Sequence, residues 1–164
     1  MLLNVRRATE ADIKAIQEIY NQGIEDRIAT LEQDRKTEEY MSNWFNSRQE
    51  RYAVIAAEEG GEIKGWASIN PYSARRAYDG VGDVSVYIHR DFRGRGIGHK
   101  LLRYLEDTAK QYNFYKLVLF TFPFNSLGQG LYRKAGYREV GTFVNQGILD
   151  GNYVDVMIME KLLP

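Results

Sequence analysis

Three glycines alternate with three other residues just before a helical pattern, in the order Arg93, Gly94, Arg95, Gly96, Ile97 and Gly98. Backbone N–H groups at the start of a helix bind phosphate, and glycine lets the ligand approach the chain closely. The spacing is not that of a P-loop, because no Gly-Lys-Ser/Thr follows, nor the G-x-G-x-x-G of dinucleotide-binding proteins. One interpretation of the segment is a flexible loop before a helix. The other, which the glycines and the following helix favour, is an anion-binding loop of another kind.

Asp83, Asn125 and Tyr132 are the other residues whose types and positions suit chemistry. Asn125 and Tyr132 are seven residues apart, close to two helical turns, so both side chains should project from one helix face. A phenol stays protonated at neutral pH and can donate its proton to a leaving group, whereas a carboxylate can accept one. The alternatives are a strand-edge carboxylate for Asp83, a helix cap for Asn125 and a core aromatic for Tyr132.

Strands and helices that would position these residues alternate along the chain. Alternating or β-branched runs predict strands at residues 3–6, 52–57, 63–69, 83–88, 115–122, 137–144 and 153–160. Apolar residues at helical spacing predict helices over 13–20, from about 37 to 45, and over 98–112 and 125–134. Residues 70–82 are expected to form a polar loop and 147–152 a turn. We therefore expect one α/β domain over residues 1–164, with antiparallel hairpins and a parallel crossover through the helix at 98–112.

The composition limits the class of protein. The chain has 164 residues, of which 44% are hydrophobic and 27% charged, as in ordinary globular domains. Lys plus Arg and Asp plus Glu both number 22, so no net charge favours nucleic acid or an anionic membrane. There is no cysteine for a disulfide, a thiolate metal site or a nucleophile, and neither histidine stands in a carboxylate cluster. With no long apolar run at its start, the chain is expected to be cytoplasmic and to bind no metal, nucleic acid or membrane.

A family resemblance accounts for the glycine-rich loop. The pattern Arg93-x-x-Gly96-x-Gly98 between a strand and a helix resembles the acetyl-CoA signature [QR]-x-x-G-x-[GA] of the GNAT N-acetyltransferases. The strand at 83–89 resembles the family's central strand, whose splayed end receives the pantetheine arm, and Asn125, Tyr132 and Gly136-Tyr137 resemble its second cofactor segment. The resemblance covers essentially the whole chain. It implies a mixed, mostly antiparallel sheet flanked by helices, with acetyl-CoA bound by Val86, Tyr87, Ile88, Arg93, Gly94, Arg95, Gly96, Ile97, Gly98, Asn125 and Tyr132.

The reaction implied by the resemblance assigns roles to Asp83 and Tyr132. An ammonium group has no lone pair, so the acceptor amine must lose a proton before it attacks the thioester. Asp83, directly or through water, is expected to take that proton. Backbone N–H groups at the end of a bulged strand can stabilise the oxyanion that forms. Tyr132 is expected to protonate the departing thiolate.

A narrower resemblance concerns the acceptor. Segments such as Ile19-Tyr20-Asn21 and Ala29-Thr30 are similar to the branch that acetylates phosphinothricin and methionine sulfoximine. That branch usually carries Glu at the position of Asp83, His at that of Tyr132, and an Arg-Pro pair in the loop where this chain has residues 72–76. The branch implies a homodimer and a small primary amine, such as an amino acid or analogue, with substrate contacts from Tyr72, Arg75, Arg76 and Asp83. The arginines would hold a carboxylate, or they are a solvated pair.

Two other functions are compatible with the same residues. The domain could bind an acyl-CoA without turnover, as a sensor or interaction module, or it could acetylate a protein N-terminus. Both the sensor and the enzyme would be stabilised by coenzyme A, but only the enzyme releases thiol when amines are added. A nucleic-acid module is disfavoured, because the charge is balanced and the glycine–arginine segment is too short for a basic stripe.

Overall fold

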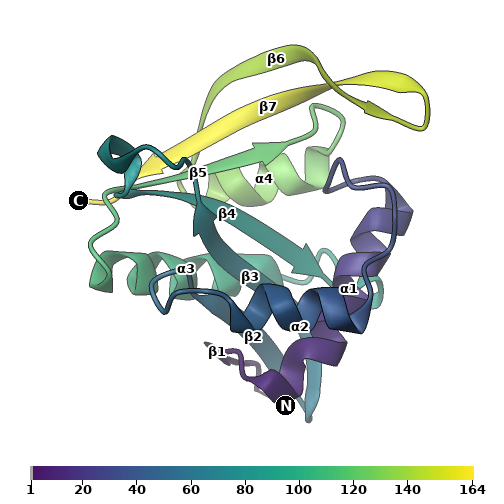
Figure 1. The fold of residues 1–164 in the computed structure, drawn as a ribbon, viewed down its shortest axis with the longest axis vertical. Helices are drawn as coiled ribbons and strands as arrows, with labels where there is room; N and C mark the ends of the chain where they lie inside the picture. Colours follow the sequence, from purple (N-terminus) through teal and green to yellow (C-terminus); the bar gives the residue numbers. More distant parts are fainter. Residues whose placement is uncertain (1) are drawn as a thin grey trace.

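A single seven-stranded sheet runs through the protein, whose computed structural model describes residues 2–164 (Figure 1). Its strands lie in the order β1-β2-β3-β4-β5-β7-β6. All neighbours are antiparallel except β4 and β5, which are parallel. The strands are β1 (Asn4–Arg7), β2 (Val54–Glu59), β3 (Glu62–Pro71), β4 (Val81–Ile88), β5 (Lys116–Thr121), β6 (Arg138–Leu149) and β7 (Asn152–Leu162). The predicted mixed, mostly antiparallel sheet with one parallel crossover is confirmed.

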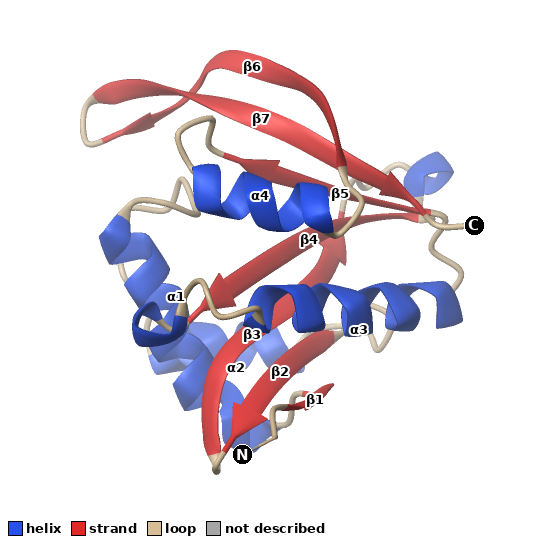
Figure 2. Cartoon of the chain, turned by 180° about the vertical axis from the view of Figure 1, so that it is seen from behind, coloured by secondary structure: helices blue, strands red, loops and turns tan. Residues whose placement is uncertain are grey.

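Four α-helices cover the sheet, two on each face. Figure 2 shows α3 (Ile97–Gln111) and α4 (Ser126–Lys134) lying across one face, with α1 (Ile13–Asp26) and α2 (Glu38–Asn46) behind the other. The apolar stripe of α3 packs on β2, β3, β5 and β7 to form the larger core, in which Leu101, Leu105 and Met159 are fully buried. Helices α1 and α2 enclose a second core around Met41 and Trp66. No helix within residues 2–164 is long and apolar enough to cross a membrane.

Polar residues that precede the helices make the hydrogen bonds at the helix N-termini. The Thr9 N–H donates to Asp12, whose carboxylate is also paired with Arg6, and a short 3₁₀ turn over Glu10–Asp12 leads directly into α1. The Thr37 hydroxyl accepts from the Tyr40 N–H and so caps α2, where the sequence predicts a helix start. Asn125 caps α4 in the same way, with its side-chain oxygen accepting from the Gly128 N–H.

Some element bounds differ from those expected. Strand β6 runs to Leu149, so residues 147–149, expected in a turn, pair with β7, and Asp150 and Gly151 make the reversal at positive φ. Strand β3 continues through Pro71, and β4 begins at Val81, which shortens the expected loop of 70–82. Cross-strand pairing extends these strands into sequences that are too polar or too rich in glycine to indicate a strand by themselves.

The parallel pair at the centre of the sheet separates along its length. Only Val81–Asp83 of β4 pair with β5, at Lys116–Val118, whereas β4 stays paired with β3 as far as Ile88. Figure 1 shows β4 and β5 diverging toward α1. The splayed central strand implied by the family resemblance is therefore present. The pairing of β3 with β4 shows no register shift, so the expectation of a bulged strand is wrong for β4. The register shift on this side of the sheet lies between β2 and β3, where Lys64 of β3 is the extra residue opposite Ala57 and Glu58.

Candidate active site

The separation of β4 from β5 leaves backbone groups of β4 facing a gap. The His89 N–H donates to the Lys64 carbonyl, and opposite residues in an antiparallel pair alternate between bonded and non-bonded. The same alternation directs the N–H groups of Val86 and Ile88 away from β3, toward the side where β5 has diverged. These two amides are therefore available to a ligand.

A cavity of about 390 Å³ lies against this edge of β4. Its walls combine β4, the start of α3 and one face of α4. They include most of the residues predicted to bind the cofactor, namely Val86, Tyr87, Ile88, Arg93, Gly94, Gly96, Ile97, Gly98, Asn125 and Tyr132. Arg95, which was also predicted to bind the cofactor, does not line the cavity; its guanidinium lies 5.4 Å from the centre of the Phe92 ring.

The glycine-rich loop contributes its backbone to this cavity. Gly94 and Gly96 have φ of +78° and +82°, a conformation that side-chain-bearing residues rarely adopt, and a Cβ at either would meet open space. The Arg93 side chain is already engaged: its NH1 lies 2.8 Å from an Asp26 carboxylate oxygen, and its Nε donates to the Ile88 carbonyl. Arg93 therefore ties the loop to α1 and to the end of β4, and the free donors of the loop are its amides.

Asn125 and Tyr132 both line the cavity, as the seven-residue spacing predicts. The Asn125 amide caps α4 and also donates to the Ile28 carbonyl at 3.2 Å, so it joins α4 to the segment after α1. Capping and cavity lining thus occur together. Tyr132 packs edge-on against Tyr137, and burial raises the pKa of its phenol to about 12, so the hydroxyl is protonated at neutral pH.

Asp83 lines a second cavity, of about 180 Å³, on the opposite face of β4. Residues 29–31 and Phe120–Phe122 form the other walls together with Val84, Ser85 and Val156. Burial raises the pKa of the Asp83 carboxyl from 3.8 to about 7, and no hydrogen bond or ion pair from residues 2–164 offsets the cost of burying its charge. A carboxyl of this kind exchanges protons readily near neutral pH.

A third cavity, of about 200 Å³, adjoins the second at Ser85. Aromatic side chains make most of its walls, and the sequence predicts no function for it. The remaining lining residues are one methionine and three polar residues, and the full set is Tyr20, Tyr40, Met41, Trp44, Trp66, Ser68, Asn70, Ser85 and Tyr87. Such a site is hard to detect in a sequence, because its members come from α1, α2, β3 and β4 and share no spacing.

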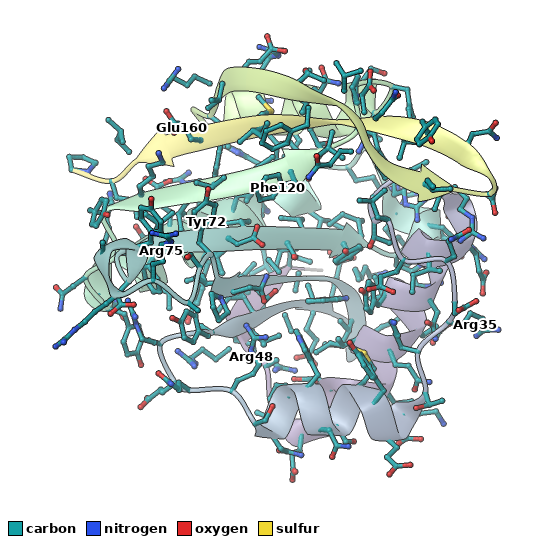
Figure 3. The ribbon with its side chains drawn as sticks, turned by 45° about the horizontal axis from the view of Figure 1, so that its top comes forward. Arg35, Arg48, Tyr72, Arg75, Phe120 and Glu160 are labelled. Atoms are coloured by element: carbon teal, nitrogen blue, oxygen red, sulfur yellow. The ribbon has the colours of Figure 1, made fainter. Side chains whose placement is uncertain are left out.

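The predicted carboxylate anchors lie apart from these three cavities. Tyr72, Arg75 and Arg76 are exposed, Tyr72 packs edge-on against Tyr78, and none of them lines the cavities described above. Figure 3 shows Tyr72 and Arg75 toward the end of the sheet where Glu160 lies, and Phe120 farther along β5. Among residues 2–164, no three His, Asp or Glu side chains gather as a metal site would require.

Comparisons with known proteins agree with this geometry. The model of the acetyltransferase (GNAT) family matches residues 14–137. A phosphinothricin N-acetyltransferase of Streptomyces coelicolor is 30% identical over 98% of this chain and 96% of its own length. An L-methionine sulfoximine/L-methionine sulfone acetyltransferase of Pseudomonas aeruginosa is 27% identical over 98% and 94%.

Two solved structures share the fold over nearly the whole chain. A ribosomal-protein-alanine N-acetyltransferase from Brucella melitensis has a TM-score of 0.94 and 30% identity, with 98% of this chain and 99% of that one covered. A phosphinothricin acetyltransferase from Sinorhizobium meliloti, in complex with AcCoA, has a TM-score of 0.92 and 27% identity, with 99% and 89% covered. The chain therefore belongs to the acetyltransferase (GNAT) family and is an N-acetyltransferase that uses acetyl-CoA.

Proposed function

We propose that this enzyme transfers the acetyl group of acetyl-CoA to the α-amine of a small amino acid or amino-acid analogue. The observation that carries the proposal is that β4 lines both cavities: Asp83 faces one, and Val86–Ile88 face the other. An amine beside Asp83 and a thioester beside Val86 would then meet in the gap where β4 leaves β5, since Ala29 lines both cavities. Holding two reactants in a productive orientation is itself a large catalytic contribution.

In this proposal, acetyl-CoA is bound by the three elements that form the cavity of about 390 Å³. The pyrophosphate sits on the amides between Arg93 and Gly98, where the positive end of the α3 dipole adds to the attraction for phosphate. The pantetheine arm runs along the unpaired edge of β4. The Val86 and Ile88 N–H groups donate hydrogen bonds to the oxygens of the arm and of the acetyl carbonyl.

The proposed reaction depends on the protonation states of Asp83, the acceptor amine and Tyr132. Asp83 takes a proton from the acceptor ammonium, and the free amine attacks the acetyl carbon to give a tetrahedral oxyanion. When the C–S bond breaks, the protonated Tyr132 hydroxyl donates its proton to the departing thiolate, and the second proton that the attacking nitrogen loses restores the Tyr132 phenol through solvent. The product is the amide, with coenzyme A released as its thiol.

The pKa of Asp83 favours an α-amine over a lysine side chain as acceptor. An α-amino group has an ordinary pKa of roughly 7.7–8.0, close to the value of about 7 for Asp83, so proton transfer between them costs little. A lysine ammonium near 10.4 would make the same transfer unfavourable by about 3 pKa units.

A protein N-terminus also carries an α-amine, and the Brucella neighbour is named for a ribosomal-protein alanine. A free amino acid differs from it by having a carboxylate. Arg75 and Arg76 lie in the exposed segment before β4, outside the three cavities, and are the proposed partners of that carboxylate where it projects from the site.

The decisive experiment is a thiol-release screen of the purified protein with acetyl-CoA. Free amino acids and their analogues are compared with peptides that carry the same first residue. Turnover of free amino acids above that of peptides supports the proposal, and robust acetylation of peptides alone would overturn it. Binding of acetyl-CoA with no thiol release from any amine would instead indicate an acyl-CoA sensor.

A homodimer in the cytoplasm is proposed as the working state, since acetyl-CoA is a cytoplasmic metabolite. The C-terminal hairpin of β6 and β7 exposes a group of apolar side chains, Val140, Phe143, Val144, Ile148 and Tyr153, at 47–74% of their surface. An exposed apolar group of this size is typical of a protein–protein contact. Measurement of the molar mass in solution tests it, and Val144→Glu should shift the mass toward that of a monomer.

A further inference from the structure

Tyr87 lies between two cavities of the protein. One is the cavity of about 390 Å³ that we assign to acetyl-CoA, the cofactor cavity. The other is the third cavity, of about 200 Å³, whose walls are mostly aromatic, the aromatic cavity. Within residues 2–164, Tyr87 is the one residue that lines both. Removal of its side chain would therefore join the two spaces.

The ring of Tyr87, and not only its backbone, separates the cavities. One ring edge faces α1: a Cβ at Gly23 would lie 3.0 Å from Tyr87 Cδ1 and 3.3 Å from Cε1. The ring also stacks on Trp66, with the ring centres 4.9 Å apart and the planes 28° from parallel. Gly23 lines the cofactor cavity and Trp66 lines the aromatic cavity, so the ring contacts a wall of each.

The space between α1 and the Tyr87 ring is too small for a carbon atom. Carbon atoms pack at about 3.5–4.0 Å, whereas a Cβ at Gly23 would lie only 3.0 Å from the ring. Glycine inside a helix is destabilising relative to alanine, and this close packing accounts for Gly23 within α1. The ring cannot retreat, because it packs on Trp66, which is 2% exposed, and on Tyr20 at 5.0 Å between ring centres.

We propose that Tyr87 limits the length of the acyl group that the enzyme transfers, so that acetyl is favoured over longer acyl chains. The inference rests on the proposed function, because it takes the thioester to lie beside Val86. Tyr87 follows Val86 on β4, and Gly23 and Ala29 line the cofactor cavity with them. An acyl chain that extends from the thioester toward α1 would meet the Tyr87 ring, whereas the acetyl methyl ends before it.

The other direction for a longer acyl chain leads past Ala29. Ala29 lines the cofactor cavity and also the cavity of about 180 Å³ that holds Asp83. In the proposed reaction, that second cavity receives the acceptor amine. An acyl chain that entered it would occupy the position from which the amine attacks, so this direction does not allow transfer of a longer acyl group.

The test compares acetyl-CoA with butyryl-CoA, whose acyl chain is two methylenes longer. Thiol release gives kcat/KM for each donor, with the free amino acid that is turned over fastest with acetyl-CoA as acceptor. For the wild-type protein, kcat/KM for butyryl-CoA should be lower by at least about tenfold, since a pocket discriminates by roughly 10- to 200-fold per methylene. Tyr87→Ala should raise the butyryl-to-acetyl ratio by at least about tenfold, because each methylene that gains a buried position is worth about fourfold.

The butyryl-to-acetyl ratio is the readout, because both donors are measured on one sample and the ratio does not depend on the folded fraction. The matched control is Tyr40→Ala, the same substitution at a wall of the aromatic cavity that the cofactor cavity does not share, and it should leave the ratio unchanged. Tyr87→Leu keeps an apolar side chain in the core, so it should raise the ratio by a smaller factor even if the alanine variant does not fold.

Equal kcat/KM for the two donors in the wild-type protein would overturn the inference. So would a ratio that the Tyr87 variants leave unchanged, or that Tyr40→Ala raises equally. Calorimetric binding of both donors without an acceptor separates this inference from the proposed function. If the wild-type protein acetylates no free amino acid, the proposed function fails. The role of Tyr87 is then supported if its variants bind butyryl-CoA more tightly relative to acetyl-CoA than the wild type does, and refuted if they do not.

Discussion

Replacement of Asp83 by Asn should make the protein more stable and less active at the same time. Burial raises the pKa of this carboxyl from 3.8 to about 7, so the native state binds the proton more strongly than the unfolded chain does. For such a group, the stabilising contribution is complete below pH 4 and is lost as the pH rises toward 7. Asn has the same shape and carries no charge at any of these pH values.

The size of the effect follows from the two pKa values. They differ by about 3, and each unit corresponds to 1.36 kcal/mol, so the wild-type protein loses up to about 4 kcal/mol between pH 4 and pH 8 through this one residue. Asp83→Asn avoids that loss. In a chain of this size, a gain of about 4 kcal/mol raises the melting temperature by roughly 10 °C.

The measurement is thermal or urea unfolding of both proteins between pH 4 and pH 8, with Asp34→Asn as a control because Asp34 is exposed. The stability difference between Asp83→Asn and wild type should grow with pH, whereas Asp34→Asn should follow the wild type. Without its base, Asp83→Asn should also lose roughly 10²–10⁴ in kcat and the rise in rate through pH 7. A stability difference that does not change with pH would refute the raised pKa, and an unchanged kcat would refute the role as base.

Three further changes test the cofactor site. Tyr132→Phe should lower kcat by about 10²-fold with little change in acetyl-CoA affinity, since only the proton donor is removed; steady-state kinetics beside direct binding separate this from a binding role. Gly96→Val should abolish thermal stabilisation by acetyl-CoA, whereas Gly61→Val, at a similar positive φ of +78° far from the cavity, should keep it; equal behaviour of the two would place the pyrophosphate elsewhere. Asp26→Asn releases the Arg93 guanidinium and should raise KM for acetyl-CoA several-fold, a change that an unaltered KM would contradict.

The cofactor side of the site could be predicted from the sequence because its determinants are local. Gly94 and Gly96 need positive φ in a short loop before a helix, and Asn125 and Tyr132 share a helix face through their spacing alone. Residues that are close together in the sequence determine both the backbone conformation of the loop and the helix face that the two side chains share. The prediction of these positions in one cavity required no knowledge of distant contacts.

The acceptor side depends on contacts between distant segments, which a single sequence does not encode. Arg48, for example, donates a hydrogen bond to Asn70, 22 residues away in the sequence. The Arg27 guanidinium pairs with Asp150 at the tip of the C-terminal hairpin, and this contact holds the segment after α1 over the site. These residues recur at no regular spacing. The contacts that they make with distant segments therefore could not be predicted from the sequence.

The divergence of β4 from β5 has a thermodynamic consequence. Without a ligand, the two halves of the sheet are joined at this point by the three paired residues Val81–Asp83, and the Val86 and Ile88 amides lack a neighbouring strand. In the proposed complex, the cofactor arm lies in the gap and takes the place of the missing strand, so that acetyl-CoA becomes part of the hydrogen-bonded framework. At a hundredfold excess over Kd, such a ligand adds about 2.7 kcal/mol to the free energy of unfolding. The free energy of unfolding of the enzyme therefore rises with the concentration of acetyl-CoA.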